Sequence, residues 1–303
     1  MNSISEQQSL KAVAWPAFPQ LSMINQAYWF RLILSEEESQ LELRYKVWIR
    51  FVKRHTNKSA LLSIDRISDI LINDEIPDLA ADQLAYETGK IFYPLIIEIS
   101  QRAQYLGVHN FEQIAERWQK LRPEIVRRFS GVEAERYFTR MNEVVASKAA
   151  VDELFRNDLL LTFCFNTVYL DYAEEPVDKK KLCFPVGDYA PVTYDVSVSK
   201  CRNAKGFKEI VQEGREVKSE GADSLHPDKS DKENTYAATF VLDTATNCIL
   251  EATAEWDFKQ PHKKNISLIL FPLRVQPDNS MDFVRNEEEN KKGRGFFSTL
   301  FGS

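Results

Sequence analysis

Regular alternation of hydrophobic and polar residues marks both ends of this chain. Between Leu41 and Phe51 every second residue is apolar, and all the residues between them are charged except Trp48. The segment Cys248–Phe258 alternates in the same way. A period of two is typical of an antiparallel strand that has one face on a core and the other toward water.

Shorter apolar runs bounded by turn residues extend this pattern over both halves of the chain. We therefore expect strands at 27–34, 40–53, 60–67, 94–100, 104–108, 182–186, 191–200, 207–217, 236–242, 248–258 and 266–275.

The middle of the chain has apolar residues at helical spacing instead. A first helix is expected over 77–90. Asn110 and Gln113 form a capping-box pattern before a second helix, and Pro123 suits the first turn of a separate short one. A further helix is expected over 132–156.

The run Leu159–Tyr172 is compatible with two structures. Asp158 can cap a buried helix there, whereas the β-branched and aromatic residues of the run also suit a strand. We favour the helix.

The order of strands, helices and strands predicts an α+β fold. We expect a curved antiparallel β-sheet from the N- and C-terminal strands with a central helical layer. Residues 1–24 are expected to be an extension, 25–277 a single domain, and 278–303 a flexible linker with an amphipathic tail. A two-domain split near 173–182 is the alternative, and 219–234 is expected to be a mobile loop because it is polar.

Composition excludes several classes of protein. The chain has 303 residues, of which 44% are hydrophobic and 28% charged, so it can bury a large core. A net charge of −6 argues against general nucleic-acid binding. Met1–Gln20 does not resemble a secretory signal, and the four cysteines form no C-x-x-C pair. We therefore expect a cytoplasmic protein.

Motifs that would indicate catalysis or a cofactor are missing from the sequence. It contains no G-x-G-x-x-G, no phosphate-binding loop of the G-x-x-x-x-G-K-[ST] type and no G-x-S-x-G. None of the four histidines has a second histidine at metal-ligand spacing. Glu98 is a lone carboxylate in an apolar strand. We expect no metal and no cofactor, and an enzyme would need a site that only the fold assembles.

One candidate ligand face lies on the polar side of the first two strands. If these strands pair as a hairpin, two tryptophans and four cations share one face of the sheet. Such a face suits an acidic peptide, a phosphate-bearing ligand or a lipid head group. The alternative is that helices cover the tryptophans while the cations extend to solvent. The six residues are Trp29, Arg31, Arg44, Lys46, Trp48 and Arg50.

A second candidate surface is the C-terminal tail, where cations precede apolar residues that fall on one face of a short helix. The cations are Lys291, Lys292 and Arg294, and the apolar residues are Phe296, Phe297, Leu300 and Phe301. These last sixteen or so residues resemble the C-terminal membrane-targeting helix of the cell-division ATPase MinD, which implies attachment to an anionic membrane. Docking of the tail onto a protein partner fits equally well.

The segment Tyr236–Val275 is also loosely similar to the strand-turn-strand edges of bacterial lipid- and lipoprotein-carrier folds. We expect a non-catalytic binding or adaptor protein that its tail recruits to a protein partner or to the inner face of the membrane. The alternatives are a carrier that encloses an apolar ligand between sheet and helices, and an enzyme whose site is not visible in the sequence.

Overall fold

A computed structural model describes residues 18–170, 177–187, 190–217, 233–259 and 263–273. Within them a single 12-stranded sheet runs in the order β6-β5-β3-β2-β1-β12-β11-β10-β9-β8-β7, and β4 pairs with β2. The strands are β1 Asn25–Glu36, β2 Ser39–Thr56, β3 Ser59–Arg66, β4 Leu71–Ile72, β5 Leu95–Ser100, β6 Tyr105–Val108, β7 Val177–Phe184, β8 Val192–Arg202, β9 Lys208–Glu216, β10 Thr235–Leu242, β11 Ile249–Phe258 and β12 Lys264–Pro272.

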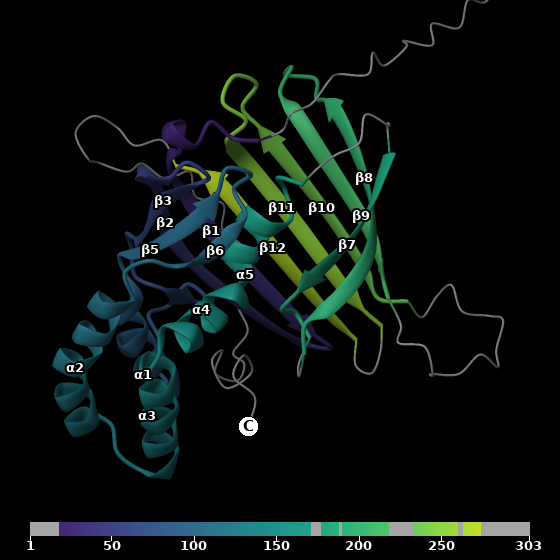
Figure 1. Cartoon of the computed structure of the whole chain (residues 1–303). Helices are drawn as coiled ribbons and strands as arrows, with labels where there is room; N and C mark the ends of the chain where they lie inside the picture. The colour runs from purple at the N-terminus through teal and green to yellow at the C-terminus, as the bar shows by residue number, and fades with distance from the viewer. Residues whose placement is uncertain (1–17, 171–176, 188–189, 218–232, 260–262, 274–303) are drawn as a thin grey trace, which may run out of the picture.

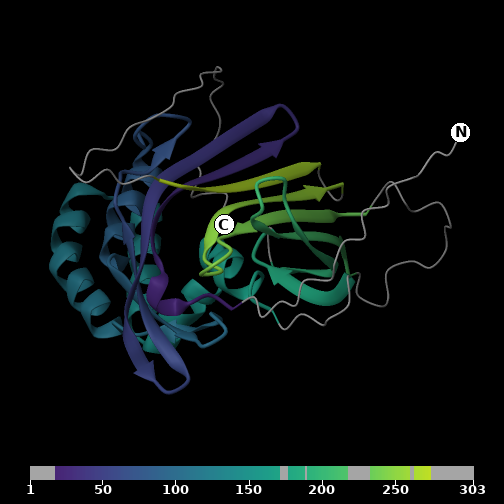
Figure 2. The ribbon, with the colours of Figure 1, turned by 90° about the horizontal axis from the view of Figure 1, so that it is seen from above.

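The first and last strands of the described chain meet in the middle of this sheet. β1 pairs with β12, with Leu32 opposite Leu268. Every named pair of strands is antiparallel, which confirms an α+β fold with an antiparallel sheet from the N- and C-terminal strands. Figure 2 shows that the sheet is curved.

The helices come between β4 and β7 in the chain. Most of them gather beside the part of the sheet that contains β2 to β6, whereas α5 lies between that part and the strands β7 to β11 (Figures 1 and 2). They are α1 Ala80–Gly89, α2 Phe111–Arg128, α3 Val132–Val145, α4 Lys148–Arg156 and α5 Leu159–Leu161, which continues as a π-helical turn over Thr162–Asn166. Over 159–166 the favoured helix is therefore confirmed.

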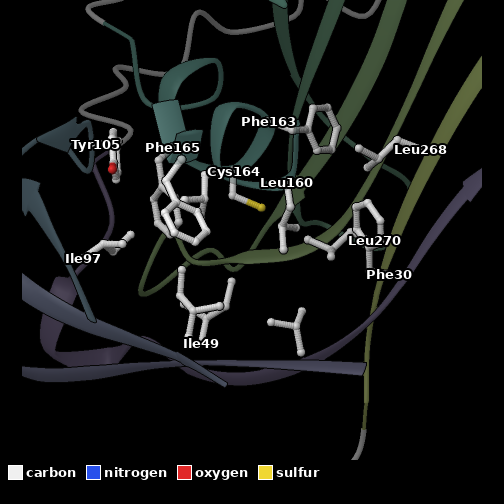
Figure 3. Close-up of a cluster of buried hydrophobic side chains, with 14 of the residues drawn as sticks. Phe30, Ile49, Ile97, Tyr105, Leu160, Phe163, Cys164, Phe165, Leu268 and Leu270 are labelled. Carbon is white, nitrogen blue, oxygen red and sulfur yellow. The ribbon is translucent and has the colours of Figure 1, made fainter. Parts of the chain in front are cut away.

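The core lies on the inner, concave face of the sheet. Buried side chains from Ile24 to Leu270 belong to one hydrophobic cluster. Phe163 and Phe165, on the π-helical turn after α5, are buried among side chains from both parts of the sheet (Figure 3). Most residues of Leu159–Asn166 are apolar, which suits a segment that lies inside the curve of the sheet.

Two helix boundaries differ from the expectation. α2 runs through Pro123 as one helix, and Pro123 is exposed, so the Gln119 carbonyl that loses its donor can bond to solvent. The expected helix over 132–156 is two helices. Ser147 separates them, because its hydroxyl accepts a hydrogen bond from the Ala150 N–H and caps α4.

Asn110 does not form the expected capping box. Its side chain makes no bond to the start of α2. Its Oδ1 instead accepts from the Ile96 N–H at 2.9 Å, and its Nδ2 donates to the Pro94 carbonyl at 2.8 Å. Asn110 is buried and ties the start of α2 to the start of β5, where its side chain satisfies two backbone groups.

Candidate functional site

The candidate ligand face exists as one surface, on the outer side of the β1–β2 hairpin. In the register of these strands Trp29 lies opposite Lys46, and Arg31 lies opposite Arg44. Neighbouring residues such as Phe30 and Val47 point inward and are buried. All six predicted residues are half-buried on the outer side. We call them, together with Phe271 described below, the tryptophan face.

Stacking and a hydrogen bond hold the two indoles. The Arg50 guanidinium lies 4.5 Å from the ring centroid of Trp48, whose Nε1 donates to Asn25 Oδ1 at 2.9 Å. The Arg44 guanidinium and the Lys46 ammonium lie 5.7 and 5.8 Å from the Trp29 ring centroid. Each such contact is worth about 0.5–1 kcal/mol at an exposed site. The face is therefore ordered by its own side chains.

Arg31 and Arg44 of this face are ion-paired. Arg31 makes a two-point contact to Glu42 at 2.8 and 2.7 Å, and Arg44 pairs with Asp74. The Glu42 side chain is only 16% exposed. Bidentate pairing with a largely buried carboxylate restricts the guanidinium and neutralises its charge.

Arg50 is paired in the same way. It contacts Asp65 Oδ2 at 2.6 Å, and the Ser63 hydroxyl donates to the same oxygen at 3.0 Å. The alternative in which these cations simply extend to solvent does not describe the arginines, because each of the three is paired with a carboxylate. Burial lowers the pKa of Lys46.

Phe271 belongs to this surface and was not anticipated. It lies opposite Trp29 on β12 and is 41% exposed. The alternation of Ile266–Phe271 in the sequence indicates that Phe271 points outward. It does not indicate that Phe271 lies beside Trp29, because β12 and β1 are far apart in the sequence and pair only in the fold. The aromatic side chains of this outer surface remain partly accessible.

A second polar cluster lies on the inner side of the sheet. Burial raises the pKa of Asp158 to about 6, although the backbone N–H groups of Leu161 and Leu160 oppose the shift. Tyr93 has its pKa raised to about 12 by burial and by the Asp158 charge, and the Arg66 guanidinium lies 5.1 Å from its ring centroid. Asp158 Oδ1 accepts from the Leu161 N–H at 2.8 Å, so its visible role is the expected helix cap.

The inner face under β8 to β11 is filled by aromatic side chains. Phe184 contacts Tyr236 and Trp256 with ring centroids 4.5 and 5.2 Å apart, and Phe163 lies 4.6 Å from Phe240. All five are fully buried. This packing leaves little space for an enclosed ligand at this place.

Within the described ranges, no group of three or more His, Cys, Asp or Glu residues could hold a metal ion. His55 and His109, far apart in the sequence, lie 4.8 Å apart between ring centroids. Glu98 is half-buried on β5, opposite Leu61.

Within the described residues no helix is both long and apolar enough to cross a membrane.

The other sequence-based candidates fall outside the described residues. This holds for the tail residues from Lys291 to Phe301, for most of the N-terminal extension and for 219–232 of the expected loop. Only Glu233 and Asn234 at the end of that loop are described.

No protein-family model and no curated protein matches this chain. Among solved structures it is similar to lipovitellin, from a study of lipid–protein interactions in that protein, at 9% sequence identity and a TM-score of 0.43. The match covers 90% of this chain and 26% of lipovitellin, so the chain spans about a quarter of that protein. A similarity this low establishes neither a common fold nor a function.

Proposed function

We propose that this is a non-catalytic binding protein that docks a partner protein on its tryptophan face. The observation that carries the proposal is the position of Trp29 and Trp48. Both indoles stay half-buried on the outer side of the sheet, and both are stacked by cations. Tryptophan and arginine are the residues most enriched at the energetic centres of protein interfaces.

The charges favour a protein over a phosphate-rich ligand. Glu42, Asp65 and Asp74 pair with the three arginines of the face. A phosphate-rich ligand needs a surface of net positive charge, and these carboxylates neutralise the positive charge of the arginines. A protein partner needs an aromatic centre surrounded by satisfied polar groups, and this is what the face presents.

The tail is part of the same proposal. Four apolar residues partly buried at a bilayer or partner surface give on the order of 4–8 kcal/mol before ordering costs, which is enough only for reversible attachment. We propose that this tail recruits the protein in the cytoplasm to a protein partner or an anionic membrane surface, and that the tryptophan face supplies specificity. The filled aromatic core supports this proposal over a carrier of an apolar ligand.

The test combines a capture experiment with quantitative binding. Proteins that bind the intact chain but not the Trp29→Ala/Trp48→Ala variant would be purified and titrated against both. We expect the double change to weaken binding at least about tenfold, with cross-links from the partner to Lys46. The matched control is Leu106→Ala/Val126→Ala, which removes exposed apolar side chains elsewhere.

Two outcomes contradict the proposal. One is a purified partner that binds the double variant as tightly as the intact protein. The other is loss of binding in both the double variant and the matched control while both variants remain folded, because the tryptophan face would then have no specific role. Thermal unfolding of each variant separates a lost contact from a lost fold.

A further inference from the structure

The two free edges of the sheet differ in how they end. The strand order places β6 at one end of the sheet and β7 at the other. An edge strand exposes backbone N–H and C=O groups that can pair with another chain, and proteins block such edges unless they use them.

The β6 edge is blocked by side chains. This strand has only four residues. The Asp152 carboxylate of α4 accepts from the Val108 N–H at 2.6 Å, and Asn166 Oδ1 accepts from the Tyr105 N–H at 3.3 Å. A Cβ at Gly107 would lie 3.1 Å from Asp152, so the close approach depends on glycine. No strand can be added where these acceptors already lie.

The β7 edge is longer and regular. Its eight residues pair with β8 without a register shift, from Val177 opposite Ser199 to Phe184 opposite Val192. Within the described part of the chain, no strand pairs with its other side.

Charge on β7 indicates what the edge selects. Lys179 and Lys181 are exposed on the outer row, whereas Leu182 and Phe184 on the inner row are buried. No ion pair of Lys179 or Lys181 occurs among the described residues. A second copy of β7 added antiparallel would bring lysines of both copies together, which like-charge repulsion disfavours.

We propose that the β7 edge accepts an extended acidic segment of a partner protein as an added strand. Its carboxylates occupy alternate positions and face Lys179 and Lys181, and its backbone pairs with β7. Edge lysines also serve to repel strands in general. The two roles differ in selectivity, because a repelling edge binds no strand, whereas a docking edge prefers an acidic one.

The experiment uses the full chain and synthetic peptides. The probe is a labelled Thr-Glu-Val-Glu-Val-Glu-Thr peptide, compared with the same peptide carrying Gln or Lys in place of Glu. We expect the acidic peptide to bind about fivefold tighter than the Gln peptide at low salt. Backbone hydrogen exchange over 177–184 should slow when it binds.

Charge reversal makes the test specific. The Lys179→Glu/Lys181→Glu variant should prefer the Lys peptide over the acidic one. The matched control Lys58→Glu/Lys205→Glu changes net charge equally at other exposed lysines and should keep the original preference. Absence of peptide binding, or a preference that does not reverse in the β7 variant, overturns the proposal. Slow exchange, before any peptide is added, of the amides of 177–184 that point away from β8 also overturns it.

Discussion

The inner and outer faces of β1 and β2 are built from alternate residues of the same strands, yet they follow different rules. On the inner face Phe30, Val47 and Ile49 are almost wholly buried. On the outer face Trp29, Trp48 and their cations are half-buried and connected by stacking and ion pairs. Burial of the inner row provides stability, and the outer row keeps large aromatic surfaces accessible at low cost. This division is expected when one face is for folding and the other for recognition.

The largest effect should come from truncating a side chain that packs against the inner face of the sheet. Phe163 is fully buried and contacts the rings of Phe240 and Trp256. We expect Phe163→Ala to lower the free energy of unfolding by about 3–5 kcal/mol, because it leaves a cavity in a packed aromatic cluster. Denaturant unfolding measures this loss. A cost below about 1 kcal/mol would show that the inner face is not the stabilising one.

Asp158 is the polar exception on the inner side, and its pKa makes a pH-dependent prediction. Its pKa is raised from 3.8 to about 6 in the folded protein, so folding is favoured when the carboxyl is protonated. Stability should therefore fall as pH rises from about 4 through about 6, by about 2 kcal/mol once partial exposure is allowed for. Asp158→Asn keeps the cap and does not titrate, so it should be the more stable protein above pH 6.

The comparison of thermal unfolding at pH 4.5 and 7.5 decides this prediction. The two proteins should differ little at the lower pH and most at the higher. An advantage of the Asn variant that is equal at both pH values would contradict a buried, titrating carboxyl.

On the outer face, loss of one ion-pair partner should cost less. Among the described residues, Arg50→Gln leaves Asp65, which is 19% exposed, with only Ser63 as a donor. We expect a loss of about 1–2 kcal/mol, part of which the double change Arg50→Gln/Asp65→Asn recovers because no unpaired charge remains. A double variant as unstable as the sum of both single variants would argue against the pair.

The smallest effect should come from an outer indole. Trp48 stacks with Arg50 and bonds to Asn25, but it stays partly accessible. We expect Trp48→Ala to cost about 1 kcal/mol in unfolding free energy while it weakens partner binding. A loss as large as that of Phe163→Ala would mean that Trp48 belongs to the core and would remove the distinction between the faces.

Most strands and their facing were predictable because they depend on neighbours along the chain. Alternation in Leu41–Phe51 places each side chain on one face or the other whatever the strand pairs with. The same logic brought the predicted cations and indoles together. The alternation gave the wrong facing at the start of β11. There the pairing with β10 shifts register between Val241 and Leu242, and Ile249 is buried in place of Cys248 and Leu250.

Partners across the fold could not be predicted in this way. The meeting of β1 with β12, the carboxylates that pair with each outer arginine, and the use of Asn110 on β5 all join residues distant in sequence. Pro123 continued a helix because its position faces solvent, and Asp158 acquired its high pKa from what surrounds it. Sequence periodicity determines which way a side chain points, whereas the tertiary structure determines what it meets, because pairing energies depend on distances that only the folded chain sets.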